Sequence, residues 1–218
     1  MVPATTPELL DLIYRLRYQV YCVEHHFEDP ANYPSGREMD SYDAHSKHVA
    51  LIYKPSGEVV GASRLILSSP TPGFQFPMLA LLGKDAVRAI RQYPLDQMAE
   101  ISRYSVSKNF RRRKDEEEYP DIGISDTDAP GGNRLTGRLS IEVIRGLMRL
   151  AVSQQIRYCC ACMRPALFRL LTHLGLTFHP IGPPVQHHGF RQPCVAAVSD
   201  LIRDIGLRLS LQSEQRMR

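Results

Sequence analysis

The chain has 218 residues, of which 43% are hydrophobic and 23% charged, and its formal net charge at pH 7 is +4. This composition predicts a globular protein that buries a real core, and we expect a single domain over residues 1–218. The sequence has no run of about 18 apolar residues and no basic-then-apolar N-terminal layout. We therefore expect no membrane span and no secretory signal, and predict a cytoplasmic protein.

The first predicted element is a helix over about residues 7 to 22. Thr6 offers a capping hydroxyl, Pro7 suits the first turn, and apolar residues then recur at helical spacing as far as Val20. A polar loop follows. Next come two strand patterns around a turn at residues 54–57, which predict a β-hairpin. The two hairpin strands are expected at residues 48–53 and 59–67.

The remainder of the chain alternates between helical and strand patterns. We expect a strand at residues 97–107 and a flexible insertion at about residues 115–135, where apolar periodicity is almost lacking. The order of elements predicts an α/β fold with a mixed central sheet that is splayed beside its central strands and flanked by helices on both faces. The other expected elements are helices at about 84–92, 137–155, 165–175 and after Ser199, and strands at 158–163 and 194–198.

Cysteines and histidines do not form a recognisable metal or disulfide framework. The five cysteines lie in apolar surroundings and are odd in number, so we expect buried, reduced thiols. The histidine pairs 25–26 and 187–188 lack a matching pair of metal-ligand spacings, so we expect no metal site. The cysteines are Cys22, Cys159, Cys160, Cys162 and Cys194.

The segment from Glu100 to Lys114 joins a strand pattern to four consecutive cations, Arg111, Arg112, Arg113 and Lys114. Four acidic residues follow at once, so the segment is a local dipole and not part of a broad basic surface. We therefore expect an anionic partner but no nucleic acid. A solvated charged loop is the simpler alternative, and nucleic-acid binding with strong salt dependence is a further one.

Four short motifs occur in order over residues 17 to 104. They are Arg17-x-x-Val20-Tyr21, Glu38-x-Asp40-x-x-Asp43, Gly61-x-x-Arg64-Leu65 and Glu100-x-Ser102-Arg103-Tyr104. Together they resemble the acyl-homoserine-lactone (autoinducer) synthases and their relatives, the long-chain N-acyl amino acid synthases and exosortase-associated acyltransferases. The resemblance implies an acetyltransferase-like fold of the GNAT superfamily, an acyl-carrier-protein or coenzyme A thioester as co-substrate, a small amine acceptor and no tightly bound cofactor.

The resemblance also implies roles for the charged residues of these motifs. Amide formation from a thioester requires an amine that has lost its proton and a stabilised oxyanion. Glu100 would accept the ammonium proton, directly or through one water, and Arg103 would be its catalytic partner. The alternatives are that Glu100 merely pairs with Arg103, and that the other charges are ordinary surface ion pairs. The expected acceptor-binding residues, which would form a charge-balanced network with Glu100 and Arg103, are Arg17, Asp40, Asp43 and Arg64, together with Phe27.

A partnership between residues 100 and 103 requires an irregular strand. On a flat strand the two side chains face opposite sides, so we expect a bulge or twist at residues 101–103. Such a bulge would also free backbone N–H groups to bind the thioester carbonyl. An unbroken ladder at this point would contradict the prediction.

Three departures from the resembled families bear on substrates. The glycine-rich pyrophosphate loop of coenzyme A users is missing, so Arg111, Arg112, Arg113 and Lys114 are expected to dock phosphopantetheine and the acidic face of an acyl carrier protein. Leu171 stands where many acetyltransferases have the tyrosine that protonates the leaving thiolate. Phe27 stands where a tryptophan is common, so acceptor recognition is expected to differ from that of the homoserine-lactone synthases.

The sequence therefore favours an N-acyltransferase that moves a medium or long fatty acyl group from a carrier-protein or coenzyme A thioester to the amine of an amino acid or related metabolite. Synthesis of an autoinducer-type signal is one option within this function. One alternative is acyl transfer to a protein or peptide amine. Another is a noncatalytic module that binds an acyl thioester or a carrier protein.

Overall fold

The computed structural model describes residues 1–71, 73–108 and 132–206, with side chains in the last range described from residue 137. The chain divides into two compact units. The first comprises Met1–Arg64 and Arg103–Leu147, and the second comprises Leu65–Ser102 and the chain from Met148 onward. The expected single domain stays a prediction.

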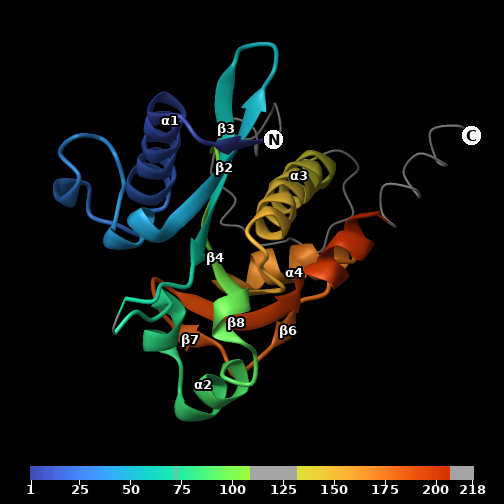
Figure 1. The fold of residues 1–218 in the computed structure, drawn as a ribbon. Coiled ribbons are helices and arrows are strands. Elements are labelled where there is room, and N and C mark those ends of the chain that lie inside the picture. The colour runs from blue at the N-terminus through green and yellow to red at the C-terminus, as the bar shows by residue number, and fades with distance from the viewer. Residues whose placement is uncertain (72, 109–131, 207–218) are drawn as a thin grey trace, which may run out of the picture. The chain divides into compact units, whose positions relative to one another are not determined.

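Within the described residues, eight strands form an open mixed sheet in the order β1-β2-β3-β4-β5-β8-β6, with β7 paired to β8 (Figure 1). Strands β4 and β5 are parallel, whereas β1–β2, β5–β8, β6–β8 and β7–β8 are antiparallel. The predicted α/β fold with a mixed sheet is confirmed. The strands are β1 (Val2–Ala4), β2 (Ser46–Tyr53), β3 (Glu58–Leu67), β4 (Met98–Val106), β5 (Tyr158–Met163), β6 (His179–Pro180), β7 (Val185–Gln186) and β8 (Phe190–Ala197).

In the first unit, α1 (Pro7–Tyr18) begins as the sequence predicts. The Thr6 hydroxyl accepts a hydrogen bond from the backbone N–H of Leu9 at 3.3 Å, and Pro7 occupies the first turn. The helix then changes to a π-helix, η1 (Gln19–Glu24), where a single α-helix was expected. Short 3-10 turns follow at η2 (Pro30–Asn32) and η3 (Ser41–His45).

The core of this unit lies between α1 and the hairpin formed by β2 and β3. The apolar face of α1 packs on small and branched side chains of the hairpin, which are Ala50, Val59 and Ala62. The first-unit part of α3 (Gly132–Ser153) contacts β4, where the Tyr104 hydroxyl and the Ser140 hydroxyl are 2.7 Å apart. Figure 1 shows α1 and α3 on opposite sides of these strands.

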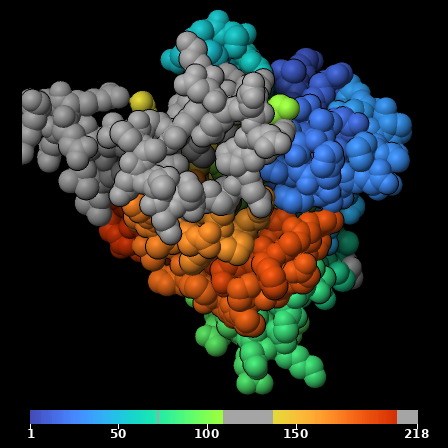
Figure 2. All heavy atoms as spheres, turned by 180° about the vertical axis from the view of Figure 1, so that it is seen from behind, coloured from blue at the N-terminus to red at the C-terminus, as the bar shows by residue number. Residues whose placement is uncertain are grey.

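In the second unit, β5 is the central strand, with β4 on one side and β8 on the other. The register places Glu100 opposite Cys160, and Cys160 opposite Val195. The helices of this unit are α2 (Lys84–Ile90), α4 (Pro165–His173) and a helix over 198–206, with 3-10 turns η4 (Pro77–Leu81) and η5 (Leu95–Gln97). Figure 2 shows the orange and red atoms of the C-terminal part of this unit as one continuous surface.

Several boundaries differ from those expected. Helix α3 begins at Gly132, five residues earlier than predicted, so residues 132–135 of the expected insertion are helical. Strand β8 begins at Phe190, and the last helix begins at residue 198, so Ser199 does not cap it. Strands β1, β6 and β7 were not predicted, because two or three residues carry no periodic pattern and pair only where β2 or β8 lies beside them.

The cysteines are free thiols, as predicted, and all but the half-buried Cys162 are buried. Burial raises the pKa of the Cys159 thiol to about 12, and this keeps it protonated at neutral pH. In the part of the chain that the structure describes, no helix has the length and apolar character needed to cross a bilayer.

Candidate active site

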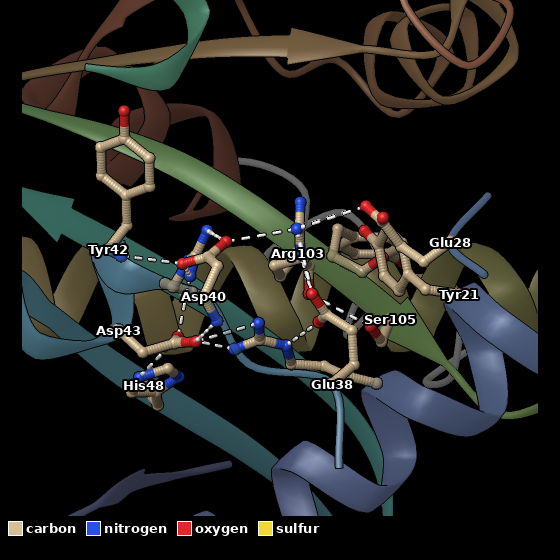
Figure 3. A network of polar contacts seen from close by, with 12 residues as sticks. Tyr21, Glu28, Glu38, Asp40, Tyr42, Asp43, His48, Arg103 and Ser105 are labelled. Carbon is tan, nitrogen blue, oxygen red and sulfur yellow. Dashed lines mark hydrogen bonds and ion pairs between the residues drawn. The ribbon is translucent and has the colours of Figure 1, made fainter. Parts of the chain in front are cut away.

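Three arginines and three carboxylates from separate segments of the first unit meet in one network of hydrogen-bonded ion pairs (Figure 3). We call this set the ion-pair network. One arginine comes from α1, one from β3 and one from β4, and all three carboxylates come from the segment that leads into β2. The members are Arg17, Arg64, Arg103, Glu38, Asp40 and Asp43.

The buried end of the network is built on Arg17 and Arg64, whose side chains are each 1% exposed. Arg17 donates from Nε to Glu38 at 2.6 Å, and from Nη1 and Nη2 to the two oxygens of Asp43 at 2.7 and 3.1 Å. Arg64 donates from Nη1 and Nη2 to the two oxygens of Asp40 at 2.6 and 2.9 Å, and Nη1 also donates to Asp43 at 2.8 Å. Such paired, bidentate contacts offset the cost of burying these charges.

Asp43 holds the centre of this arrangement. Burial acts to raise its pKa, but the hydrogen bond from Arg17 and the positive charges of Arg17 and Arg64 outweigh burial and hold it well below its usual range. The pKa of Asp40 is also lowered, because its hydrogen bond to Arg64 and the charges of Arg64 and Arg103 outweigh burial. Both groups therefore remain carboxylates at neutral pH.

The spacing of Asp40 and Asp43 has a local structural cause. Asp40 caps η3, since its side chain accepts from the backbone N–H of Tyr42 at 2.9 Å, while Asp43 accepts from the backbone N–H of Asp40 at 2.8 Å. This reciprocal capping box turns both carboxylates toward the arginines. The phenol ring of Tyr42 points away from them (Figure 3).

Strand β4 changes its backbone conformation where Arg103 joins the network. Arg103 has a φ of 50°, in the left-handed region, and the pairing of β4 with β5 covers only Met98 to Ile101. The backbone therefore departs from regular strand geometry at Arg103, inside the segment 101–103 where a bulge or twist was predicted, while its use as an oxyanion hole stays a prediction. The Arg103 guanidinium lies 5.2 Å from the Tyr21 ring centroid, and Tyr21 donates from its hydroxyl to the carbonyl of Tyr104 at 3.2 Å.

Glu38 is the site residue that our sequence analysis did not assign. It is fully buried, and it bonds Arg17 through one oxygen and Arg103 through the other, the latter at 3.0 Å. The sequence argument gave the third anionic position to Glu100. The signal was present in the sequence, because Glu38 opens the motif that contains Asp40 and Asp43, but its burial could not be read from the pattern.

Glu100 belongs to the second unit and is 4% exposed. Its Oε2 accepts a hydrogen bond from the backbone N–H of Met78 at 3.0 Å, and it lies opposite Cys160 in the β4–β5 register. Burial and the negative charge of Glu100 raise the pKa of the Cys160 thiol well above its ordinary value. The catalytic role expected for Glu100 stays a prediction.

Two aromatic residues lie beside the network. Phe27 stacks on His25 with ring centroids 5.0 Å apart and meets the Tyr21 ring edge-on at 6.0 Å, so it is linked to Arg103 through Tyr21. The buried His48 lies with Nε2 3.6 Å from Asp43, and burial lowers its pKa to about 4. His48 is therefore neutral at pH 7, and this contact is not an ion pair there. The sequence gave no signal for it.

The remaining expected residues and groups concern the donor and metals. Arg111, Arg112, Arg113 and Lys114 lie outside the described residues, so their docking role stays a prediction. In the described part of the chain, no three His, Cys, Asp or Glu side chains gather as metal ligands would.

The ion-pair network lies within the part of the sequence that matches a known domain. Residues 16–117 match the family model described as an acetyltransferase (GNAT) domain. The chain has the GNAT acetyltransferase fold. The match supports the predicted acyltransferase. None of the curated proteins matches the sequence significantly.

Solved structures that share this GNAT fold include the CoA-dependent acyl-homoserine lactone synthase BjaI, solved with SAM and isopentyl-CoA. BjaI is 20% identical, with a TM-score of 0.63 over 92% of this chain and 80% of BjaI. The acyl-homoserine lactone synthase LasI is 16% identical, with a TM-score of 0.57 over 90% of this chain and 88% of LasI. FeeM, an N-acyl amino acid synthase from uncultured soil microbes, is 13% identical, with a TM-score of 0.54 over 92% of this chain and 97% of FeeM. The resemblance found in the sequence is thus confirmed at the level of the fold.

Proposed function

We propose that the protein is an N-acyltransferase that moves a medium or long fatty acyl group from a thioester donor to the amine of an amino acid or related metabolite. The observation that carries this proposal is the buried, charge-balanced ion-pair network inside the GNAT-matched residues. Ion pairs buried this deeply bring little net stability, so their retention favours a role in holding a functional segment.

The ion-pair network would act by fixing the segment from Glu38 to Asp43. Arg17 and Arg64 clamp its carboxylates from two other elements, so the loop cannot shift without leaving buried charges unpaired. An acceptor bound against this segment would be held in one orientation, which is a large part of what an acyl transfer between two substrates requires.

Glu100 is the proposed proton acceptor for the attacking amine. The amine must lose its proton before it can attack the thioester carbonyl, and a carboxylate within hydrogen-bond reach or one water away can accept it. The Met78 N–H bond fixes one carboxylate oxygen. Leu171 cannot protonate the leaving thiolate.

The proposed donor is the thioester of an acyl carrier protein or of coenzyme A. The missing glycine-rich loop and the basic run at residues 111–114 favour the carrier protein. The coenzyme A dependence of BjaI, whose fold this chain shares, favours the alternative. Direct comparison of both donors is therefore part of the test.

The test combines the purified chain, acyl carrier protein or coenzyme A thioesters of several lengths, and a panel of amines, with products identified by mass spectrometry. Glu100→Gln should lower acyl transfer roughly 100-fold or more while donor binding is retained. Glu8→Gln, at an exposed position of α1, is the matched control and should leave the rate unchanged. A wild type that binds donor but never transfers it would indicate a binding module, and acylation of peptides alone would indicate the protein-directed alternative.

A further inference from the structure

The C-terminal part of the second unit has arginines but no acidic residues over a long stretch. The chain has 23 aspartate and glutamate residues, yet none of them lies between residues 148 and 199, which we call the acid-free stretch. Residues 65–102, the other stretch of this unit, are balanced, with three acidic and three basic side chains. A one-sided charge of this kind indicates an anionic partner. The arginines of the acid-free stretch are Arg149, Arg157, Arg164, Arg169 and Arg191.

The positive charge of the acid-free stretch is accessible to solvent. Arg149, Arg157 and Arg169 are exposed, and none of the three forms an ion pair with a residue that the structure describes. The hydrogen-bond partner of Arg157, Gln97, is neutral. Figure 2 shows the surface to which this stretch contributes, in orange and red. Charges that no internal carboxylate neutralises act on anions in solution over about one Debye length, roughly 10 Å at 0.1 M salt.

The loop between β7 and β8 is exposed and is held by contacts of its own. Every residue from Gln186 to Phe190 is exposed. Arg191 donates from Nε to the carbonyl of His187 at 3.0 Å and from Nη2 to the carbonyl of His188 at 3.1 Å. His188 and Gly189 both have positive φ angles, as the central residues of a tight hairpin turn do. The loop therefore has a defined shape although its residues are exposed.

Phe190 places a large apolar ring at this loop. It is 66% exposed, the highest value among the large hydrophobic residues that the structure describes. The imidazole rings of His187 and His188 belong to the same turn, with centroids 4.5 Å apart, and Arg191 follows Phe190 on β8. An apolar ring beside polar and cationic groups suits a membrane–water interface, where the ring enters the headgroup region and guanidinium groups pair with phosphates.

A lipid surface fits these features better than a folded partner does. A specific protein interface covers about 800 Å² on each partner and requires matching shapes. The loop offers one apolar ring on a short turn, and lipids rearrange around such a ring without a matching pocket. The acid-free stretch adds attraction to anionic headgroups, which increases with each arginine near the surface.

We propose that the β7–β8 hairpin docks the protein on an anionic lipid bilayer. Phe190 enters the headgroup region, while the positive charge of the acid-free stretch attracts the lipid phosphates. The binding is peripheral, since no helix in the described part of the chain could cross the bilayer. The inference concerns a surface of the second unit and does not depend on the proposed acyl transfer.

Vesicle sedimentation with the full chain measures the binding. One set of vesicles contains phosphatidylcholine alone, and the other contains phosphatidylglycerol as well. We expect at least about tenfold tighter binding to the vesicles with phosphatidylglycerol, because several arginines contribute to the attraction. Added sodium chloride should weaken this binding, because salt screens the charges. Equal binding to both kinds of vesicle, or binding to neither, overturns the proposal.

A tryptophan at the hairpin reports its contact with lipid directly. The chain has no tryptophan of its own, so Phe190→Trp introduces a unique fluorophore. We expect its emission to shift to shorter wavelength when phosphatidylglycerol vesicles are added. Leu95→Trp is the matched control, because Leu95 is 41% exposed and lies in the balanced stretch of the same unit, and its emission should stay unchanged. Vesicle binding without a shift at position 190, or equal shifts at both positions, overturns the assignment to the hairpin.

Phe190→Ser tests the contribution of the ring itself. We expect it to weaken binding to phosphatidylglycerol vesicles about fivefold or more, because the apolar area that enters the interface is lost. Leu95→Ser is the control and should bind as the wild type does. Circular dichroism establishes that both variants are folded. Unchanged vesicle binding in a folded Phe190→Ser contradicts the proposal.

Other anionic macromolecules are alternative outcomes of the same test. Acyl carrier protein and duplex DNA are titrated separately against the wild type and Phe190→Ser. If either binds the wild type more tightly than the variant while vesicles do not bind, the hairpin docks that macromolecule and the membrane proposal is wrong. None of these measurements requires acyl transfer, so a failure of the proposed function would leave their interpretation unchanged.

Discussion

Two buried carboxylates of the ion-pair network each accept hydrogen bonds from two arginines. Glu38 accepts from Arg17 of α1 and from Arg103 of β4, and Asp43 accepts from Arg17 and Arg64. A buried arginine that loses one of its two carboxylates has no water to take the place of that carboxylate. Loss of a shared carboxylate should therefore cost more folding free energy than loss of a surface ion pair. His48 lies against this arrangement as a neutral group at pH 7, because burial lowers its pKa to about 4.

His48 predicts a pH dependence of stability. Burial lowers its pKa from 6.5 to about 4, so between these values the unfolded chain binds a proton that the folded chain does not. Stability from this group is complete above pH 6.5 and falls as the pH drops toward 4, by about 2 kcal/mol between pH 7 and pH 5. Urea unfolding of wild type and His48→Leu at both pH values measures this difference.

The variant should have a free energy of unfolding that falls less over this interval than that of the wild type. His173→Gln, at an exposed position of α4, is the control and should retain the wild-type pH dependence. Parallel pH profiles for wild type and His48→Leu would show that His48 is not the titrating group.

At the scale of elements, two irregularities bring the site together. Tyr21 lies in the π-helix η1 that continues α1, and Arg103 has a left-handed backbone conformation within β4. The two irregular segments contact each other, because the Tyr21 ring lies under the Arg103 guanidinium and the Tyr21 hydroxyl donates to the carbonyl of Tyr104. Local departures of this kind in a helix and a strand are common at functional sites.

Replacement of Tyr21 separates its two contributions. Tyr21→Phe removes the hydrogen bond to the Tyr104 carbonyl and should cost about 1 kcal/mol of folding free energy. Tyr21→Leu also removes the cation–π contact with Arg103 and should cost about 1 kcal/mol more, with a larger loss of turnover. Chemical unfolding and acyl-transfer rates of both variants test this order. Equal effects would mean that the ring does not support Arg103.

The sequence predicted the elements that carry their own signals. Thr6 and Pro7 marked the start of α1, and β5 was predicted at its observed bounds, because capping and apolar runs are local properties. The bulge or twist predicted at residues 101–103 followed from a chemical requirement and not from a pattern, and Arg103 in this segment has a left-handed backbone conformation. The π-helix and the place of Glu38 in the ion-pair network were missed, because each depends on contacts between residues far apart in the chain.

At the scale of the whole molecule, the basic run at residues 111–114 bears on which acyl donor the protein uses, an acyl carrier protein or coenzyme A. Charge reversal in Arg111→Glu with Arg112→Glu should raise the KM for an acyl carrier protein donor by about tenfold or more, since it opposes the acidic face of the carrier. The KM for a short pantetheine thioester should change little. Steady-state kinetics with both donors measures the ratio, and equal increases would contradict docking through this run.

Strands β3 and β4 each begin in one compact unit and end in the other, at Arg64–Leu65 and at Ser102–Arg103. Each unit is therefore assembled from two separate stretches of chain, and no contiguous fragment contains one whole unit without part of the other. A truncation designed to isolate the ion-pair network would sever both strands beside two of its arginines. Engineered versions of the protein for crystallisation, fusion or split-reporter assays should accordingly keep residues 58–106 unbroken and place new junctions elsewhere.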